Sequence, residues 1–146
     1  MNSTLYDLKP PAFLAAVARE ILAYFARLNK PVRSHARSHL AQFWWGSDSS
    51  VHYEISIHER TGRIELGLHF ESTPTRNSSL YAAFDSYLLE IQNQLGDSVW
   101  LEEWDKGWAR LYETQPLSPL DDARVYALAG RFCEIMEYLQ PIYETL

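Results

Sequence analysis

Two histidines and two glutamates fall on the polar sides of neighbouring segments in which apolar and polar residues alternate. If the segments pair as a hairpin, His52 lies opposite His69, with Glu54 and Glu71 close by and His58 further along. The groups of His52, Glu54 and His69 can hold zinc or iron and leave one position open for water. Their spacing matches no known metal motif, and histidine is also ordinary on a solvated strand. A solvated face is therefore the alternative.

A short near-repeat, Arg-Ser-His-Ala followed by Arg-Ser-His-Leu, concentrates positive charge in an otherwise acidic chain. Its candidate anion-binding residues are Arg33, His35, Arg37 and His39. On a helix His35 and His39 would be four residues apart, a spacing that also suits a metal ion. No glutamate follows the first histidine, so the motif of zinc metalloproteases is absent. The patch could contact phosphate or an acidic partner surface, and the alternative is a solvated helix face.

The third candidate is a group of large aromatic side chains, which we call the aromatic ladder. Its members are Trp100, Trp104, Trp108 and Tyr112. A three-residue turn ending in Gly107 would pair Trp104 with Trp108. The same register sets Trp100 beside Tyr112 and forms an ion pair of Glu102 with Arg110. Exposed tryptophans would form an apolar patch, and such patches usually mark interfaces. The alternative is that the first helices or the N-terminal arm cover them.

Motifs of catalysis are missing from the chain. It has no glycine-rich phosphate loop and no Gly-x-Ser-x-Gly turn. Cys133, the single cysteine, falls on the apolar side of an expected helix and is interpreted as a buried small hydrophobe. We therefore expect no cofactor and favour a binding function over catalysis. A metal-dependent enzyme that uses His52, Glu54 and His69 is the alternative.

Composition narrows the class of protein further. The 146 residues carry a net charge of −6, and 47% of them are apolar. An acidic surface makes nucleic-acid binding unlikely, although Phe43, Trp44 and Trp45 beside the basic patch could stack bases. Residues 1–11 show no secretory signal, and no apolar run approaches the ~20 residues of a membrane span. We expect a cytoplasmic protein.

Apolar residues at helical spacing predict three helices that would position these groups. They span about residues 11–28, 78–95 and 118–140, with Ser118 as the cap of the last helix and Pro141 at its end. Residues 31–45 fit both a short amphipathic helix and a period of two. We expect the helix there.

Strict alternation predicts two β-hairpins, at residues 51–71 and 99–113. In the first, a four-residue loop that ends in Gly62 pairs His58 with Arg63 and keeps the apolar residues of both strands on one face. A three-residue loop would set apolar residues opposite polar ones.

These elements predict an α+β fold made of one domain, residues 1–146. A single antiparallel sheet of about four strands, from the two hairpins, would be covered on one face by three to four helices. The order is α(α)-ββ-α-ββ-α. The side chains expected to face the helices include Ile55, Leu66, Leu101 and Leu111.

The size, the acidic charge and the order of elements resemble those of small acidic bacterial chaperones that serve secretion systems. The resemblance is one of size, charge and layout, and no sequence motif carries it. It implies an α+β homodimer that binds unfolded protein segments on a sheet surface. The expected function is a non-catalytic interaction module that binds a protein partner or a second copy through the aromatic ladder. The alternative is a metal-dependent enzyme or ligand-binding protein.

Overall fold

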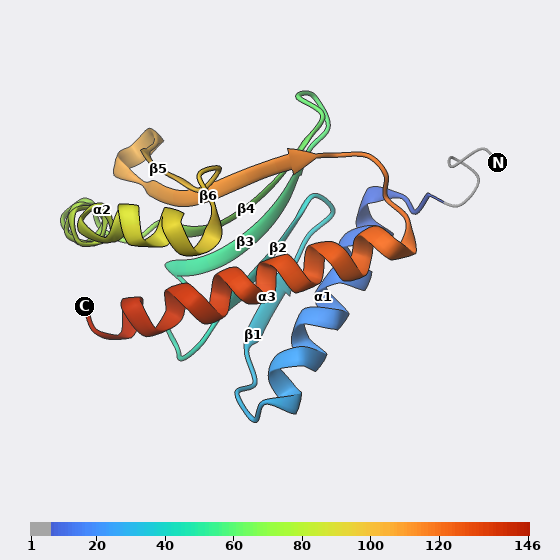
Figure 1. The fold of residues 1–146 in the computed structure, drawn as a ribbon, viewed down its shortest axis with the longest axis horizontal. Helices are drawn as coiled ribbons and strands as arrows, with labels where there is room; N and C mark the ends of the chain where they lie inside the picture. The colour runs from blue at the N-terminus through green and yellow to red at the C-terminus, as the bar shows by residue number, and fades with distance from the viewer. Residues whose placement is uncertain (1–6) are drawn as a thin grey trace.

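The computed structural model describes residues 7–146, and the expectation of no secretory signal rests partly on residues 1–6, outside that range. The described residues form three long helices and one sheet, arranged as in Figure 1. In chain order the elements are α1 (Pro10–Arg27), β1 (Arg33–Ala36), β2 (Leu40–Trp44), β3 (Val51–His58), β4 (Arg63–Phe70), α2 (Pro74–Leu95), β5 (Trp100–Glu103), the 3-10 turn η2 (Asp105–Gly107), β6 (Ala109–Pro116) and α3 (Asp122–Glu144).

The predicted α+β fold with one antiparallel sheet is confirmed, and of the three to four helices expected the described residues form three. The sheet has six strands rather than about four, and the order of elements along the chain is α-ββ-ββ-α-ββ-α rather than α(α)-ββ-α-ββ-α. The strand order in the sheet is β1-β2-β3-β4-β6-β5, and every neighbouring pair is antiparallel. The first predicted hairpin forms in the expected register, with His58 opposite Arg63. Pairing of β4 with β6 joins the two predicted hairpins into one sheet.

The expected helix at residues 31–45 is wrong, because this segment forms the hairpin of β1 and β2. Strand β2 pairs with β3, whose outer edge would otherwise have no strand partner. The pairing also buries Ala41 and Phe43, and the Phe43 ring packs edge-on against Phe132 of α3 at 5.8 Å. Tertiary contacts therefore favour the period of two over the helical pattern.

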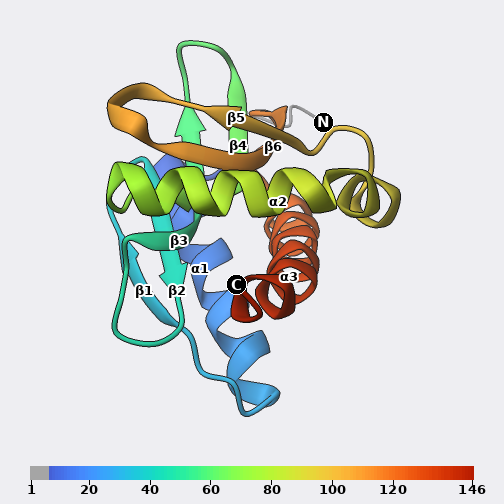
Figure 2. The same ribbon diagram turned by 90° about the vertical axis from the view of Figure 1, so that its left-hand side faces the viewer.

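All three helices lie on one side of the sheet (Figures 1 and 2). Phe84 of α2 stacks on Phe70 of β4 at 5.4 Å, while α3 packs on β2 and β3, and α1 lies beside α3. The aliphatic residues expected to face the helices are 0–4% exposed: Ile55, Leu66, Leu101 and Leu111. We call the other side of the sheet, which carries the polar residues of β3 and β4, the open face.

Three helix ends differ from the sequence prediction, two in α3 and one in α2. The cap of α3 is Asp121, whose side chain accepts a hydrogen bond from the amide of Arg124 at 2.8 Å, so Ser118 is not the cap. The helix also continues past Pro141 to Glu144. Helix α2 begins at Pro74, four residues earlier than expected. In the described part of the chain, no helix is long and apolar enough to cross a bilayer.

Candidate functional site

Strands β3 and β4 bring two histidines together on the open face. His52 pairs with His69, as the sequence predicts, and their ring centroids are 5.6 Å apart. Glu54 and Glu71 lie beside them, and one ligand atom from each of the four residues falls within 4.8 Å of the others. His52, Glu54 and His69 are only 3%, 7% and 0% exposed, so the interpretation as a solvated strand face is wrong.

His69 lies between two carboxylates. Its Nδ1 is 3.0 Å from an oxygen of Glu71, and its Nε2 is 3.0 Å from an oxygen of Glu65. Burial lowers the pKa of His69, but the hydrogen bonds to Glu65 and Glu71 and the charge of Glu54 outweigh it and raise the pKa to about 9. In the absence of another cation, His69 is therefore a buried imidazolium at neutral pH.

Glu54 and His52 form the other half of the cluster. Nε2 of His52 is 3.3 Å from Glu54, and its Nδ1 is 2.8 Å from the carbonyl oxygen of Ser49. The side-chain amide of Gln42 donates to Glu54 at 3.0 Å. Burial raises the pKa of Glu54, but the hydrogen bond with His52 and the charge of His69 overcome this effect and lower the pKa to about 2. Glu54 therefore stays ionised although it is buried.

A stack of side chains from the second predicted hairpin covers the cluster. The Arg110 guanidinium lies over the rings of Trp104 and Tyr112, 4.6 Å and 4.2 Å from their centroids. The Trp104 ring stands edge-on to His69 at 5.7 Å, and Arg110 forms an ion pair with Glu65. Sequence reasoning missed Glu65, because its role depends on the pairing of β4 with β6. The one available signal was its place on the polar side of β4.

The aromatic ladder forms with the pairs that the sequence predicts. Trp100 lies opposite Tyr112, and the rings of Trp104 and Trp108 meet edge to face at 6.0 Å. Glu102 and Arg110 form the expected ion pair at 2.9 Å. Trp100 is 55% exposed and Trp104 39%, while Trp108 and Tyr112 are half-buried. Helix α1 packs on the opposite face of the sheet (Figure 2), so it does not cover the ladder, and residues 1–6 of the N-terminal arm, the other expected cover, lie outside the described residues.

The basic near-repeat lies at the far edge of the sheet, on β1 and the turn that follows it. Arg33, His35, Arg37 and His39 are all exposed. His35 and His39 do not share a helix face, because His35 is on β1 and His39 is in the β1–β2 turn. The metal spacing inferred from a helix is therefore wrong, and anion binding by these residues stays a prediction.

The aromatic residues beside this patch do not form a stacking platform for bases. Phe43 is 0% exposed on the helix-covered face. Trp45 packs edge-on against Phe25 at 5.0 Å, and its Nε1 donates to the carbonyl oxygen of Lys30 at 3.0 Å. Two of the three rings that could have stacked bases are thus used inside the fold, Phe43 against α3 and Trp45 against α1.

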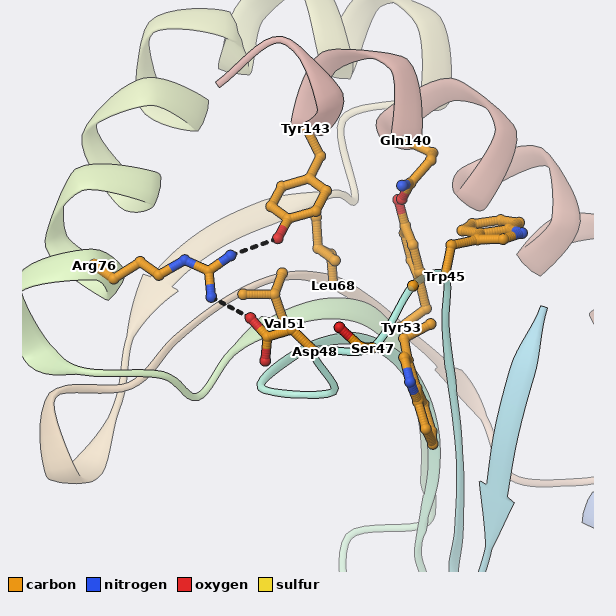
Figure 3. A pocket seen from close by; sticks show the side chains of 11 residues that line it. Trp45, Ser47, Asp48, Val51, Tyr53, Leu68, Arg76, Gln140 and Tyr143 are labelled. Atoms are coloured by element: carbon orange, nitrogen blue, oxygen red, sulfur yellow. Dashed lines mark hydrogen bonds and ion pairs between the residues drawn. The ribbon is translucent and has the colours of Figure 1, made fainter.

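A cavity of about 210 Å³ opens between the β2–β3 loop and the ends of α2 and α3 (Figure 3). Its cation, Arg76, forms an ion pair with Asp48 and donates to the hydroxyl of Tyr143 at 2.7 Å. Hydrogen bonds from Ser50 and then from Arg76 lower the pKa of Asp48 to about 2. The charges of Arg76 and Asp48 neutralise each other. Their contacts link α2 to the β2–β3 loop, and they leave no free reactive group in the cavity.

Comparison with known proteins yields only distant similarities of structure. No family model matches the chain, and no curated protein matches it. A chain of the HopA1–SchA chaperone–effector complex is 16% identical with a TM-score of 0.44, covering 88% of this chain and 94% of that chain. A chain of the ExsC–ExsE complex is 14% identical with a TM-score of 0.40, covering 88% and 93%. Both TM-scores are below 0.5, so neither complex indicates a function for this chain.

Proposed function

We propose that this chain is a non-catalytic protein-binding module, of the chaperone or adaptor kind, that holds a short apolar segment of another protein on its aromatic ladder. The observation that carries the proposal is the exposure of Trp100 and Trp104, 55% and 39%, on the face opposite the helices. Exposure of a tryptophan side chain to water is unfavourable in free energy. Tryptophan is also enriched among the interface residues that contribute most of the binding energy.

Two rings of the ladder, those of Trp104 and Tyr112, are held by contacts within the chain itself. Trp104 and Tyr112 both stack with the guanidinium of Arg110, which also forms ion pairs with Glu65 and Glu102. The hydroxyl of Tyr112 donates to Glu102 at 2.9 Å. Side chains that are already fixed lose little conformational entropy on binding, so more of the contact energy is available for affinity.

The sheet edge beside the ladder supports binding of an extended segment. Strand β5 is the last strand in the sheet order, so among residues 7–146 the backbone groups on its outer side have no strand partner. An incoming segment could add to this edge through main-chain hydrogen bonds while its apolar side chains contact Trp100.

The exposed area favours a short segment over a second copy as the occupant. Trp100 and Trp104 together expose roughly 200 Å² if a whole tryptophan side chain presents up to ~250 Å². A stable protein–protein interface buries about 800 Å² per partner. The predicted homodimer would therefore need additional surface, and it stays a prediction.

The described residues offer no serine or cysteine set up for nucleophilic catalysis. Ser56 Oγ is 3.0 Å from Nε2 of His58, and Ser38 Oγ is 2.7 Å from Nδ1 of the exposed His39, but no carboxylate among residues 7–146 lies within hydrogen-bond distance of either ring to orient it. Cys133 is 4% exposed in the core. Burial, and then the charge of Glu137, raises the pKa of its thiol to about 12, far from that of a reactive thiolate.

Selection of peptides on the purified chain tests the proposal. A random peptide library should yield sequences rich in apolar residues, and their affinity can be measured by titration calorimetry. The variant W100A/W104A should lose at least tenfold in affinity, because truncating a tryptophan that anchors an interface costs about 2 kcal/mol or more. The matched control is L89A, which truncates a side chain on α2 that is 83% exposed. It should bind like the wild type.

Two results would contradict the proposal. One is a set of peptides that bind W100A/W104A as tightly as the wild type. The other is sedimentation of the wild type as a dimer at micromolar concentration that W100A/W104A converts to monomer. The second result would assign the ladder to a second copy of the chain instead.

A further inference from the structure

We propose that His52, Glu54, His69 and Glu71 together bind one zinc ion on the open face. The separations of their ligand atoms carry this inference. Nε2 of His52 is 3.3 Å from Oε1 of Glu54 and 3.7 Å from Oε2 of Glu71, and Nδ1 of His69 is 3.8 Å from Oε2 of Glu54 and 3.0 Å from Oε2 of Glu71. One ligand atom from each residue lies within 4.8 Å of the others. Ligands of a tetrahedral zinc, at bonds of about 2.0–2.1 Å, are about 3.3 Å apart, which lies inside this range.

The second nitrogen of each ring is already held as a metal-binding histidine requires. Nδ1 of His52 is 2.8 Å from the carbonyl oxygen of Ser49, and Nε2 of His69 is 3.0 Å from Glu65. Metal-bound histidines almost always donate this second N–H to a carbonyl or a carboxylate, which fixes the tautomer and the ring orientation. Both rings therefore present the correct nitrogen to the common centre without any change of rotamer.

The excess of negative charge in the cluster favours binding of a cation. Three carboxylates, those of Glu54, Glu65 and Glu71, hydrogen-bond to the two rings, and Glu65 also forms an ion pair with Arg110. A metal-bound imidazole is neutral, so zinc would displace the proton that His69 holds in its absence; Arg110 is shared between Glu65 and Glu102, which leaves the charges of Glu54 and Glu71 to the ion in a site whose members are largely buried. Buried charges are unfavourable unless they are paired or coordinate a metal, and a divalent ion supplies the missing two positive charges.

The number of ligands indicates a structural role for the zinc. Two imidazole nitrogens and two carboxylate oxygens fill a tetrahedral shell, which is the arrangement of closed structural sites rather than of catalytic sites with a bound water. The Trp104 ring lies edge-on to His69 at 5.7 Å, on the side of β6. The ion would join β3 to β4 and fix the ring on which Trp104 rests. Zinc binding can be measured without any protein partner, so its failure is distinct from failure of the peptide experiment.

Zinc titration of the full chain, first stripped of metal with a chelator, tests the inference. Titration calorimetry should give one ion per chain, and zinc at a hundred times its Kd should raise the melting temperature by roughly 5–10 °C. The variant E71Q, at the more exposed rim of the cluster, should keep the fold and weaken zinc binding at least tenfold. H52Q should do the same. The matched control H58Q removes an exposed histidine of the same strand and should bind zinc like the wild type.

Cobalt(II) adds a readout that depends on geometry. Substituted for zinc, it should give the intense visible absorption of a tetrahedral site in the wild type and in H58Q, and lose it in E71Q. The inference is overturned if the wild type binds no zinc at micromolar concentration. It is equally overturned if E71Q and H52Q bind as the wild type does while H35Q/H39Q abolishes binding, because the ion would then be held by the exposed β1–β2 turn.

Discussion

Substitution of Gly67 by alanine tests how closely the two halves of the sheet approach each other. Gly67 lies on β4 opposite Tyr112 of β6, at the junction of the two predicted hairpins. A Cβ atom at this position would be 2.6 Å from Cβ of Tyr112 and 2.7 Å from the carbonyl oxygen of Leu111. Carbon atoms normally approach to about 3.5 Å at best, so the strands would have to separate by roughly 1 Å.

The cost of G67A follows from that displacement. Forcing an extra methyl group into a filled space typically costs about 1–3 kcal/mol, and the flanking ladder hydrogen bonds would lengthen as well. We expect a loss of about 2–3 kcal/mol in the free energy of unfolding. With urea m-values of about 1–3 kcal/mol/M, the midpoint should fall by about 1 M or more. Circular dichroism is the suitable signal, because the fluorescence of Trp104 would respond to the same movement.

The control is a glycine with free space around it. Gly130 lies in α3, and a Cβ atom there would have no heavy atom within 4 Å. G130A should therefore stabilise the chain by about 0.5–1 kcal/mol, since alanine is the better helix residue. An unchanged urea midpoint for G67A would refute the reasoning. It would mean that β4 and β6 can move apart to admit a methyl group without loss of folding free energy.

Three further predictions concern other contacts. R131M should lower the free energy of unfolding in urea by about 3 kcal/mol, because Glu113 is 4% exposed and would lose the guanidinium 3.1 Å away. Adding E113Q to R131M should recover part of this loss. If the losses of the two single variants simply add in the double variant, the prediction is contradicted. The thiol of Cys133, with its pKa raised to about 12, should react with Ellman's reagent at pH 8 only after unfolding; rapid reaction of the folded chain would disprove its burial. Asp48 has a pKa of about 2 in the folded chain, below the value of 3.8 in the unfolded chain. Its contribution to the free energy of unfolding is therefore fully present above about pH 4 and is lost as the pH falls through 2. Since the side chain of Asp48 is half exposed, D48N should cost only about 0.5–1 kcal/mol at pH 6 and nothing near pH 2, and a pH-independent cost would contradict the assignment.

The pairing within each predicted hairpin could be read from the sequence, because it depends on neighbouring residues. Alternation over residues 51–71 fixes which side chains share a face, and the loop length fixes the register, so His52 was correctly placed opposite His69. The same reasoning placed Trp100 opposite Tyr112. In both cases a shift by one residue would turn an apolar set toward water.

Only the tertiary structure decided what lies beside those hairpins. Residues 31–45 carry a pattern that suits helix or strand, and the unpaired edge of β3 selects the strands. The pairing of β4 with β6 joins residues that are about 40 to 50 positions apart in the chain, such as Phe70 and Ala109, and no local signal encodes it. That pairing brings Arg110 to Glu65 and Trp104 to His69, so it turns an apparently solvated strand face into a buried charged cluster. Local alternation thus determined which side chains of a strand point to the same face of the sheet. Burial and charge pairing on the open face depend on contacts that form only when the whole sheet assembles.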